Sequence, residues 1–188
     1  TVLRADASAA RSVESRSSLG SFRNSIEPVS LDTYRFGVGA SQQFARLRLD
    51  GSFGLRDVNF NDVTGLNGVI INQQFRDVRT LTETLSGQYD VGNGIGIIVT
   101  GRANQSSFDF RPGAVGFNPL VNVDRASSGF SLEGGVSLEL SSLVFGTIQV
   151  GYLRQSYRDP RLRDFTGLSF NANVLGNVTS LTSLRVRA

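Results

Sequence analysis

The segment Phe130–Leu140 places apolar residues on one side of an extended chain and polar residues on the other. Its apolar positions are Phe130, Leu132, Val136, Leu138 and Leu140, and its polar positions include Ser131, Glu133, Ser137 and Glu139. Because successive side chains of a β-strand point to opposite faces, this pattern predicts a strand with one apolar and one polar face. Similar alternation recurs along the chain, which predicts an all-β protein.

We expect about eight antiparallel strands that pair in chain order as an up-and-down meander, with almost no helix. The alternation places them near residues 33–41, 44–56, 79–91, 95–104, 129–140, 144–154, 168–174 and 179–186. Residues 31–188 form this β-region, whereas residues 1–30 are rich in Ser, Arg and Ala and are expected to be a loop or a poorly ordered lead-in. Within that lead-in, only a weak strand near residues 2–10 is predicted.

The connections between these strands alternate between very short and very long. The short ones include Gly92-Asn93-Gly94, Ser141-Ser142-Leu143 and Gly176-Asn177; each long one ends in an adjacent Arg and Asp, namely Arg76-Asp77, Asp124-Arg125 and Arg163-Asp164. Short turns at one rim and long loops at the other are typical of a transmembrane outer-membrane β-barrel, with apolar side chains toward lipid and polar ones toward the lumen. A soluble β-sandwich alternates as well, but the unequal loops favour the barrel.

Strand orientation follows from this interpretation. Outward positions are predicted for Leu47, Leu49, Phe53, Leu132, Val136, Leu138, Ile148 and Val150, and inward positions for Arg46, Arg48, Glu133, Glu139 and Gln149. Aromatic residues near strand ends suit the interfacial girdles of such a barrel: Tyr34, Phe36, Tyr89, Phe130, Tyr152 and Phe170.

The short turns also predict where the strands begin. In bacterial barrels the short turns face the periplasm and both chain ends lie on that side, whereas the first predicted strand, 33–41, enters from the long-loop side. We therefore expect an internal part of a larger barrel, in which strands 33–41 and 179–186 do not pair with each other. The alternative is a closed eight-stranded barrel in an unusual orientation.

The composition excludes several kinds of chemistry. The chain has no Cys, His or Lys, so a disulfide, a Cys-based zinc site, a histidine base and a phosphate-loop lysine are absent. Glu133 and Glu139 are six residues apart on one strand, or about 20 Å, too far for a glycosidase pair. We expect no enzyme, cofactor or metal site. The 19 basic residues are spread among 16 acidic ones, and no basic run with aromatic residues predicts nucleic-acid binding.

Charged residues on the predicted polar faces are candidates for the lumen wall. They are Arg35, Arg46, Arg48, Asp50, Arg56, Arg102, Glu133 and Glu139. In one interpretation the arginines form a ladder that favours anions or acidic sugars. In the other, the acidic residues pair with the arginines and fill or stiffen the interior.

Three stretches resemble a known family. They are Ser30–Ala40, Leu138–Gly146 and the run from Val150-Gly151-Tyr152 through Tyr157–Pro160 to Phe165–Leu168. Over roughly residues 30–188 the chain resembles the putative β-barrel porin family of alphaproteobacterial outer-membrane proteins, often linked to exopolysaccharide loci. The resemblance implies a Gram-negative outer-membrane location and a barrel about twice this length.

Three functions fit these observations. The first is a porin-like passive channel tied to polysaccharide export, in contact with outer-membrane lipid, polysaccharide or small polar solutes, and other chains or strands that complete the barrel. The second is a structural or adhesive surface barrel with a filled lumen. The third is a soluble, secreted β-sandwich that binds glycan.

Overall fold

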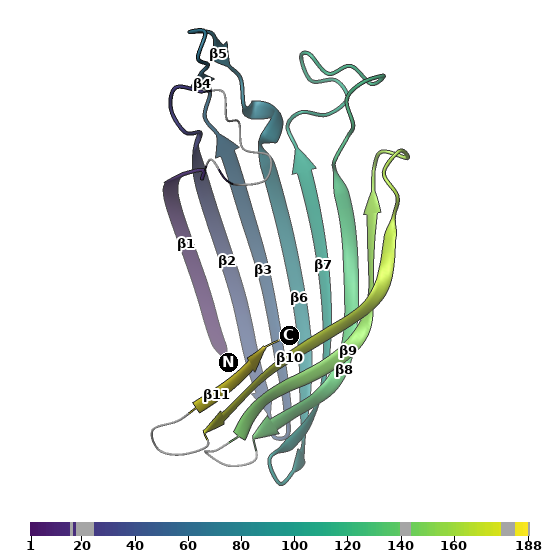
Figure 1. Ribbon diagram of the computed structural model, residues 1–188. Coiled ribbons are helices and arrows are strands. Elements are labelled where there is room, and N and C mark those ends of the chain that lie inside the picture. The colour runs from purple at the N-terminus through teal and green to yellow at the C-terminus, as the bar shows by residue number, and fades with distance from the viewer. Residues whose placement is uncertain (16, 18–24, 140–143, 178–182, 188) are drawn as a thin grey trace.

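The chain folds into one long, curved antiparallel sheet of nine strands (Figure 1). The computed structural model describes residues 1–15, 17, 25–139, 144–177 and 183–187. The strands of this sheet, in spatial order, are β1 (Val2–Val13), β2 (Ser30–Phe44), β3 (Leu47–Phe60), β6 (Val78–Gly92), β7 (Ile95–Phe108), β8 (Ser127–Glu139), β9 (Val144–Tyr157), β10 (Phe165–Asn177) and β11 (Ser183–Arg187). The long β3–β6 connection holds a small hairpin, β4 (Val63–Thr64) and β5 (Ile70–Ile71), and the 3-10 turn η1 (Gln74–Arg76).

The predicted meander is confirmed. Each strand of the sheet pairs antiparallel with its neighbour in chain order, and most are a few residues longer than the alternation predicts. The turn after β6 contains Asn93 at φ +54° and Gly94 at φ +73°, the left-handed conformations that a tight Asn-Gly turn requires. Leu140, the turn Ser141-Ser142-Leu143 and residues 179–182, for which the sequence predicts strand or turn, lie outside the described residues.

The prediction that residues 1–30 are mainly loop is wrong over Val2–Val13. These residues form β1, which pairs with β2 over its whole length, from Val2 opposite Ser41 to Val13 opposite Ser30. The alternation of β1 is hard to recognise because three of its apolar positions are alanine, a weak strand former. Pairing with the strongly alternating β2 compensates for that weakness.

The position of β1 also corrects the predicted topology. Val2 lies opposite Ser41, next to the short β2–β3 turn, so the first strand starts at the short-turn rim and not at the long-loop rim. The described sheet is open: β1 pairs only with β2, and β11 pairs only with β10. The prediction that the segments 33–41 and 179–186 do not pair with each other is confirmed for the described residues.

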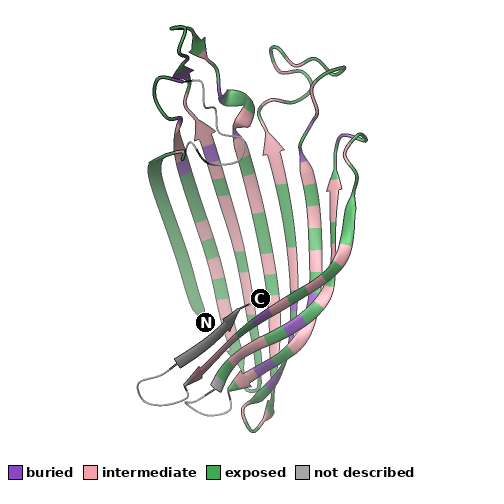
Figure 2. Cartoon of the chain, in the orientation of Figure 1, coloured by how far each residue is buried: buried purple, intermediate pink, exposed green. Residues whose placement is uncertain are grey.

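The two faces of the sheet differ in chemistry. On what we call the outer face, Leu132 is 57% and Val150 58% exposed, whereas on the inner, concave face Glu133 is 3% and Gln149 5% exposed (Figure 2). The outward positions predicted for Leu47, Leu49, Val136 and Ile148 are confirmed by their exposure. A β-sandwich would bury these residues between two sheets. Since the described chain has one large sheet with its apolar side chains exposed, the sandwich interpretation is wrong.

The apolar part of the outer face has the length of a membrane-spanning band. On β3 it runs from Leu47 to Leu55, which is about 26 Å along the strand and close to the ~25 Å apolar band of outer-membrane barrels. The next outward residue is Asp57, which forms an ion pair with Arg79 of β6. The outer face therefore becomes charged where the long loops begin.

Glycines let the C-terminal strands bend across the front of the sheet (Figure 1). An added Cβ at Gly151 of β9 would lie 2.0 Å from the carbonyl oxygen of Leu132, and one at Gly135 of β8 would lie 1.9 Å from that of Ile148. Real side chains cannot approach backbone atoms so closely. Glycines at these inner-face positions therefore permit the close approach of β8 and β9, as expected where a sheet curls.

We predict opposite effects for two glycine substitutions on neighbouring strands. Gly151→Ala should destabilise the protein by about 1–3 kcal/mol, because the added methyl group collides with the β8 backbone. Gly134→Ala on the outer face meets no atom within 4 Å and should be neutral or stabilising by about 0.4–1 kcal/mol. Urea unfolding of both variants measures the difference; equal stabilities would contradict this role of Gly151.

Candidate functional site

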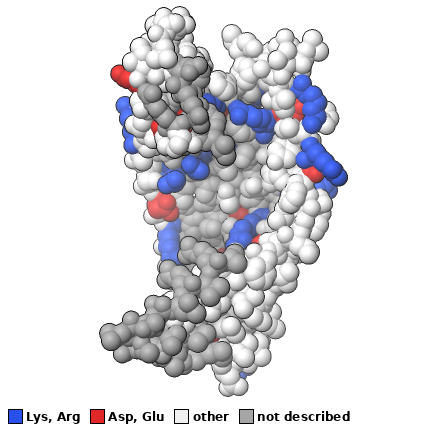
Figure 3. Space-filling view, viewed as in Figure 1, with Lys and Arg blue, Asp and Glu red and all other residues white. Residues whose placement is uncertain are grey.

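The strand registers place the predicted wall residues on the inner face, with Arg46 and Glu139 at its short-turn end. Arg35 and Arg56 lie opposite each other on β2 and β3, and Arg48 and Asp50 lie on β3 nearer the short β2–β3 turn. Arg102 and Glu133 come from β7 and β8. In the space-filling view, arginines lie along the hollow with a few acidic groups among them (Figure 3). The two interpretations left open by the sequence depend on which of these charges pair.

Arg102 and Glu133 form the centre of a polar network in which Glu133 is buried, whereas Arg102 and Ser169 are half-buried. Arg102 Nη1 donates a hydrogen bond of 3.0 Å to Glu133 Oε2, and the Ser169 hydroxyl of β10 donates to Glu133 Oε1. Gly151 lies between Glu133 and Ser169 in the register, so its missing side chain leaves the space across which Ser169 reaches. Here the charges pair and stiffen the wall, as the second interpretation predicts.

A second group of charges lies at the short-turn rim. Arg48 pairs with Asp50 on the same strand at 2.9 Å. Arg46 and Arg48 line a cavity of about 360 Å³ together with Asp90 and Glu139. Arg46 and Glu139 make no ion pair within the described parts of the chain. This end of the inner face is therefore a mixed-charge vestibule.

Arg35 and Arg56 differ from Arg48 and Arg102, which pair with acidic residues. They are directly opposite in the β2–β3 register, both are exposed, and neither forms an ion pair with any residue that the structure describes. The polar residues beside them on the same face are Ser8 of β1 and Thr80 of β6. Like charges opposite each other are unfavourable in a sheet. The positive charge of this pair is not balanced by an ion pair with any residue that the structure describes.

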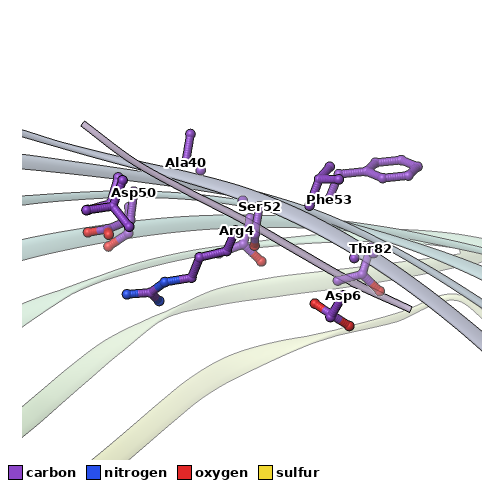
Figure 4. Close-up of a pocket in the computed structure, with 16 residues that line it drawn as sticks. Arg4, Asp6, Ala40, Asp50, Ser52, Phe53 and Thr82 are labelled. Carbon is purple, nitrogen blue, oxygen red and sulfur yellow. The ribbon is translucent and has the colours of Figure 1, made fainter. Parts of the chain in front are cut away.

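A cavity of about 420 Å³ lies on the inner face beside this pair, against β1, β2, β3 and β6. Arg4, Asp6, Asp50 and Thr82 point into it, whereas Ala40 and Phe53 point to the opposite side of the sheet (Figure 4). Hydroxyl groups also line it, from residues that include Ser41, Ser52, Thr84 and Ser86. Charged and hydroxyl-bearing side chains from four strands thus give the cavity many hydrogen-bonding groups, which suit a polar solute.

The long loops are tied together by Arg76 and Arg125, whose contacts the sequence did not predict. Arg76 of η1 donates two hydrogen bonds, of 2.9 and 2.6 Å, to Glu14 after β1, and its guanidinium lies 4.0 Å from the centre of the Phe60 ring. Arg125 before β8 donates to the carbonyl oxygen of Phe75. The β1–β2, β3–β6 and β7–β8 loops are thus each linked to the next one along the rim.

The Arg-Asp pairs at the loop ends were the one signal of this rim in the sequence. Asp77 accepts the backbone N–H of Phe60 at 2.7 Å, and Asp164 accepts that of Tyr157 at 3.1 Å. Each aspartate thus joins the start of one strand to the end of the preceding one. Burial raises the pKa of Asp77, whereas the Tyr157 N–H lowers the pKa of Asp164.

The last two long loops are joined at Asp159. Its carboxylate pairs with Arg161 at 2.6 Å and accepts the backbone N–H of Asp124 at 3.1 Å. Asp124 is 3% exposed and lies 3.6 Å from Arg158. The hydrogen bonds from Arg161 hold the pKa of the Asp159 carboxyl well below its usual range. The loops therefore stay joined in mild acid.

We predict that this loop contact weakens only in strong acid. Because the folded-state pKa of Asp159 is lowered, its contribution to stability is present above the ordinary Asp pKa of about 3.9 and is lost as the pH falls from there through the lowered pKa. The amide of Asp124 reports the contact, since it donates to Asp159. Hydrogen-exchange protection of this amide should therefore fall below about pH 4.

Asp159→Asn should remove that pH dependence, whereas Asp109→Asn, an exposed acid in the β7–β8 loop, should keep it. Protection of Asp124 that stays constant down to pH 2, or that still varies in Asp159→Asn, would contradict the assignment.

Among the residues that the structure describes, no group of three or more His, Cys, Asp or Glu residues could hold a metal ion, and no helix is long and apolar enough to cross a membrane.

Comparison with known proteins supports one assignment. Neither a curated protein nor a solved structure matches the chain. A family model described as "Putative beta-barrel porin 2" matches residues 1–188. The matched range includes β1 as well as the three stretches in which the sequence resembles the family. This match confirms the resemblance seen in the sequence. The chain belongs to the putative beta-barrel porin 2 family.

Proposed function

We propose that the chain forms wall strands of a passive channel in the outer membrane of a Gram-negative bacterium, through which polar solutes, polysaccharide among them, are transported. The observation that carries this proposal is the difference between the two faces of the sheet. The outer face exposes residues such as Leu132 and Val150, and the inner face carries Arg, Glu, Ser and Thr. The polar inner face suits contact with water, and the apolar outer face suits contact with lipid.

The energy of exposed apolar surface supports a lipid-facing outer side. Burial of apolar surface is worth roughly 25 cal/mol per Å², so a continuous band of exposed Leu, Val, Ile and Phe is unfavourable in water. In lipid the same band is favourable, and aromatic residues at its ends suit the membrane interface. Tyr34 lies next to the outward Asp32 at the long-loop end, and Tyr89 lies near the short β6–β7 turn.

The same environment implies partners for the sheet edges. Backbone groups of β1 and β11 that face away from the described sheet need hydrogen-bond partners in lipid, where each unsatisfied group costs several kcal/mol. We propose that further strands or other chains complete the barrel. Transport in this account is passive and requires no catalytic residue.

A structural barrel with a filled lumen is the second candidate. It is favoured by the network of Arg102, the buried Glu133 and Ser169, which joins β7, β8 and β10 across the inner face. The cavity beside β1 to β6 argues for an open path elsewhere along the wall.

Conductance separates the two candidates. The protein reconstituted into a planar lipid bilayer should produce discrete, long-lived current steps in potassium chloride. A protein that inserts into vesicles without producing such steps would rule out the channel and support the filled barrel. Purification from the aqueous phase without detergent would contradict both.

Lipid exposure gives a further prediction. Leu132→Arg should destabilise the protein in phospholipid vesicles by about 2–4 kcal/mol if this residue lies near the middle of the membrane. Thr82→Arg, an equally drastic change at an exposed inner-face position, should cost much less because the new charge faces water. Urea titration in vesicles measures both values; similar costs would contradict the assignment of the faces.

A further inference from the structure

We propose that Arg35 and Arg56 form a binding site for the carboxylate of an acidic sugar on the inner face. The proposal rests on the channel function for the route by which the sugar arrives, but binding itself does not depend on conduction.

Arg35 and Arg56 carry charge that remains after the wall arginines are sorted by partner, whereas Arg46 shares a cavity with Asp90 and Glu139. Arg48 pairs with Asp50, and Arg102 pairs with Glu133. Arg35 and Arg56 have no acidic partner among the described residues, although they occupy directly opposite positions of one strand pair. An anion between the two guanidinium groups would remove their mutual repulsion.

The geometry of arginine suits a shared ligand. Directly opposite residues on one face of an antiparallel pair have Cβ atoms about 4.5–5.5 Å apart, so the two planar side chains can lie next to each other. A guanidinium group binds a carboxylate or phosphate through two parallel hydrogen bonds. Two such groups side by side therefore suit one oxyanion.

A cavity lies beside the pair on the inner face. The next inner-face positions along β2 and β3 are Gly37 and Gly54, which lie opposite each other. A Cβ at Gly54 would meet only the carbonyl oxygen of Thr82, at 3.9 Å, whereas one at Gly37 would lie 2.6 Å from the Asp6 carboxylate. The row therefore leaves room above β3, and Asp6 lies above β2. Both glycines line the cavity of about 420 Å³, a volume within the roughly 300–1,000 Å³ of small-molecule sites.

The lining of the cavity identifies the rest of the ligand. Hydroxyl groups of Ser52, Thr82 and Thr84 and the carboxylate of Asp6 can bond to the hydroxyl groups of a sugar. A free phosphate would use the two arginines and leave these groups without a partner. The arrangement therefore favours an anionic group attached to a polyhydroxylated body.

Calorimetry of the purified chain in detergent micelles tests the site. Sodium glucuronate should bind measurably, more tightly than glucose, which lacks the charge, and more tightly than inorganic phosphate, which lacks the sugar body. Arg35→Gln combined with Arg56→Gln should weaken glucuronate binding at least tenfold. Arg111→Gln combined with Arg163→Gln removes the same charge from exposed loop positions and should leave binding unchanged.

A lysine variant guards against a simple loss of folding. Arg35→Lys combined with Arg56→Lys keeps the charge but removes the two-pronged donors, and should weaken binding less than the glutamine pair. The proposal is overturned if phosphate binds as tightly as glucuronate, if glucose does, or if the glutamine pair binds like the loop control. Current steps without glucuronate binding would refute this site alone, and glucuronate binding without current steps would refute only the channel.

Discussion

Backbone hydrogen bonding between neighbouring strands is the interaction on which the rest of this structure depends. A strand in lipid has no water to satisfy its N–H and C=O groups, so every strand needs a paired neighbour. The nine-stranded meander supplies one for all strands between β1 and β11. Once that pairing fixes the register, the period of two along each strand decides which side chains face lipid and which face the interior.

Curvature then divides the inner face into two regions. Near β8 to β10, glycines such as Gly151 let strands approach closely, and Glu133 is buried by contacts with Arg102 and Ser169. Along β2 and β3 the sheet stays more open, and Arg35 and Arg56 keep free charge beside a cavity. A stiff, neutralised wall on one side and an open, basic wall on the other would let one barrel combine stability with solute recognition.

Much of the fold was predictable from the sequence because a period of two and a set of turn residues are local signals. Strands β2, β3 and β6 to β10, the Gly92-Asn93-Gly94 turn and the outward direction of Leu132 and Val150 all follow from such signals. Strand β1 was predicted only as a weak strand near residues 2–10, because its small alanines carry little hydrophobic contrast and its pairing with β2 is a tertiary contact.

The candidate site was predictable only as a set of residues. The sequence indicates that Arg35, Arg48, Arg56 and Arg102 share a face, but pairing partners depend on the register between strands. The contact of Ser169 with Glu133 crosses a whole strand at Gly151, and the Glu14–Arg76 pair joins residues 62 positions apart. No local pattern encodes contacts of this kind.

The central claim is that the outer face of the sheet contacts lipid and the inner face contacts water. The chain has no cysteine, so Leu85→Cys on the outer face and Thr82→Cys on the inner face can each carry a single environment-sensitive fluorophore. In lipid vesicles, we expect spin-labelled lipid to quench the probe at position 85 and aqueous iodide to quench the probe at position 82. Iodide quenching at both positions, or the reverse pattern, would contradict the account.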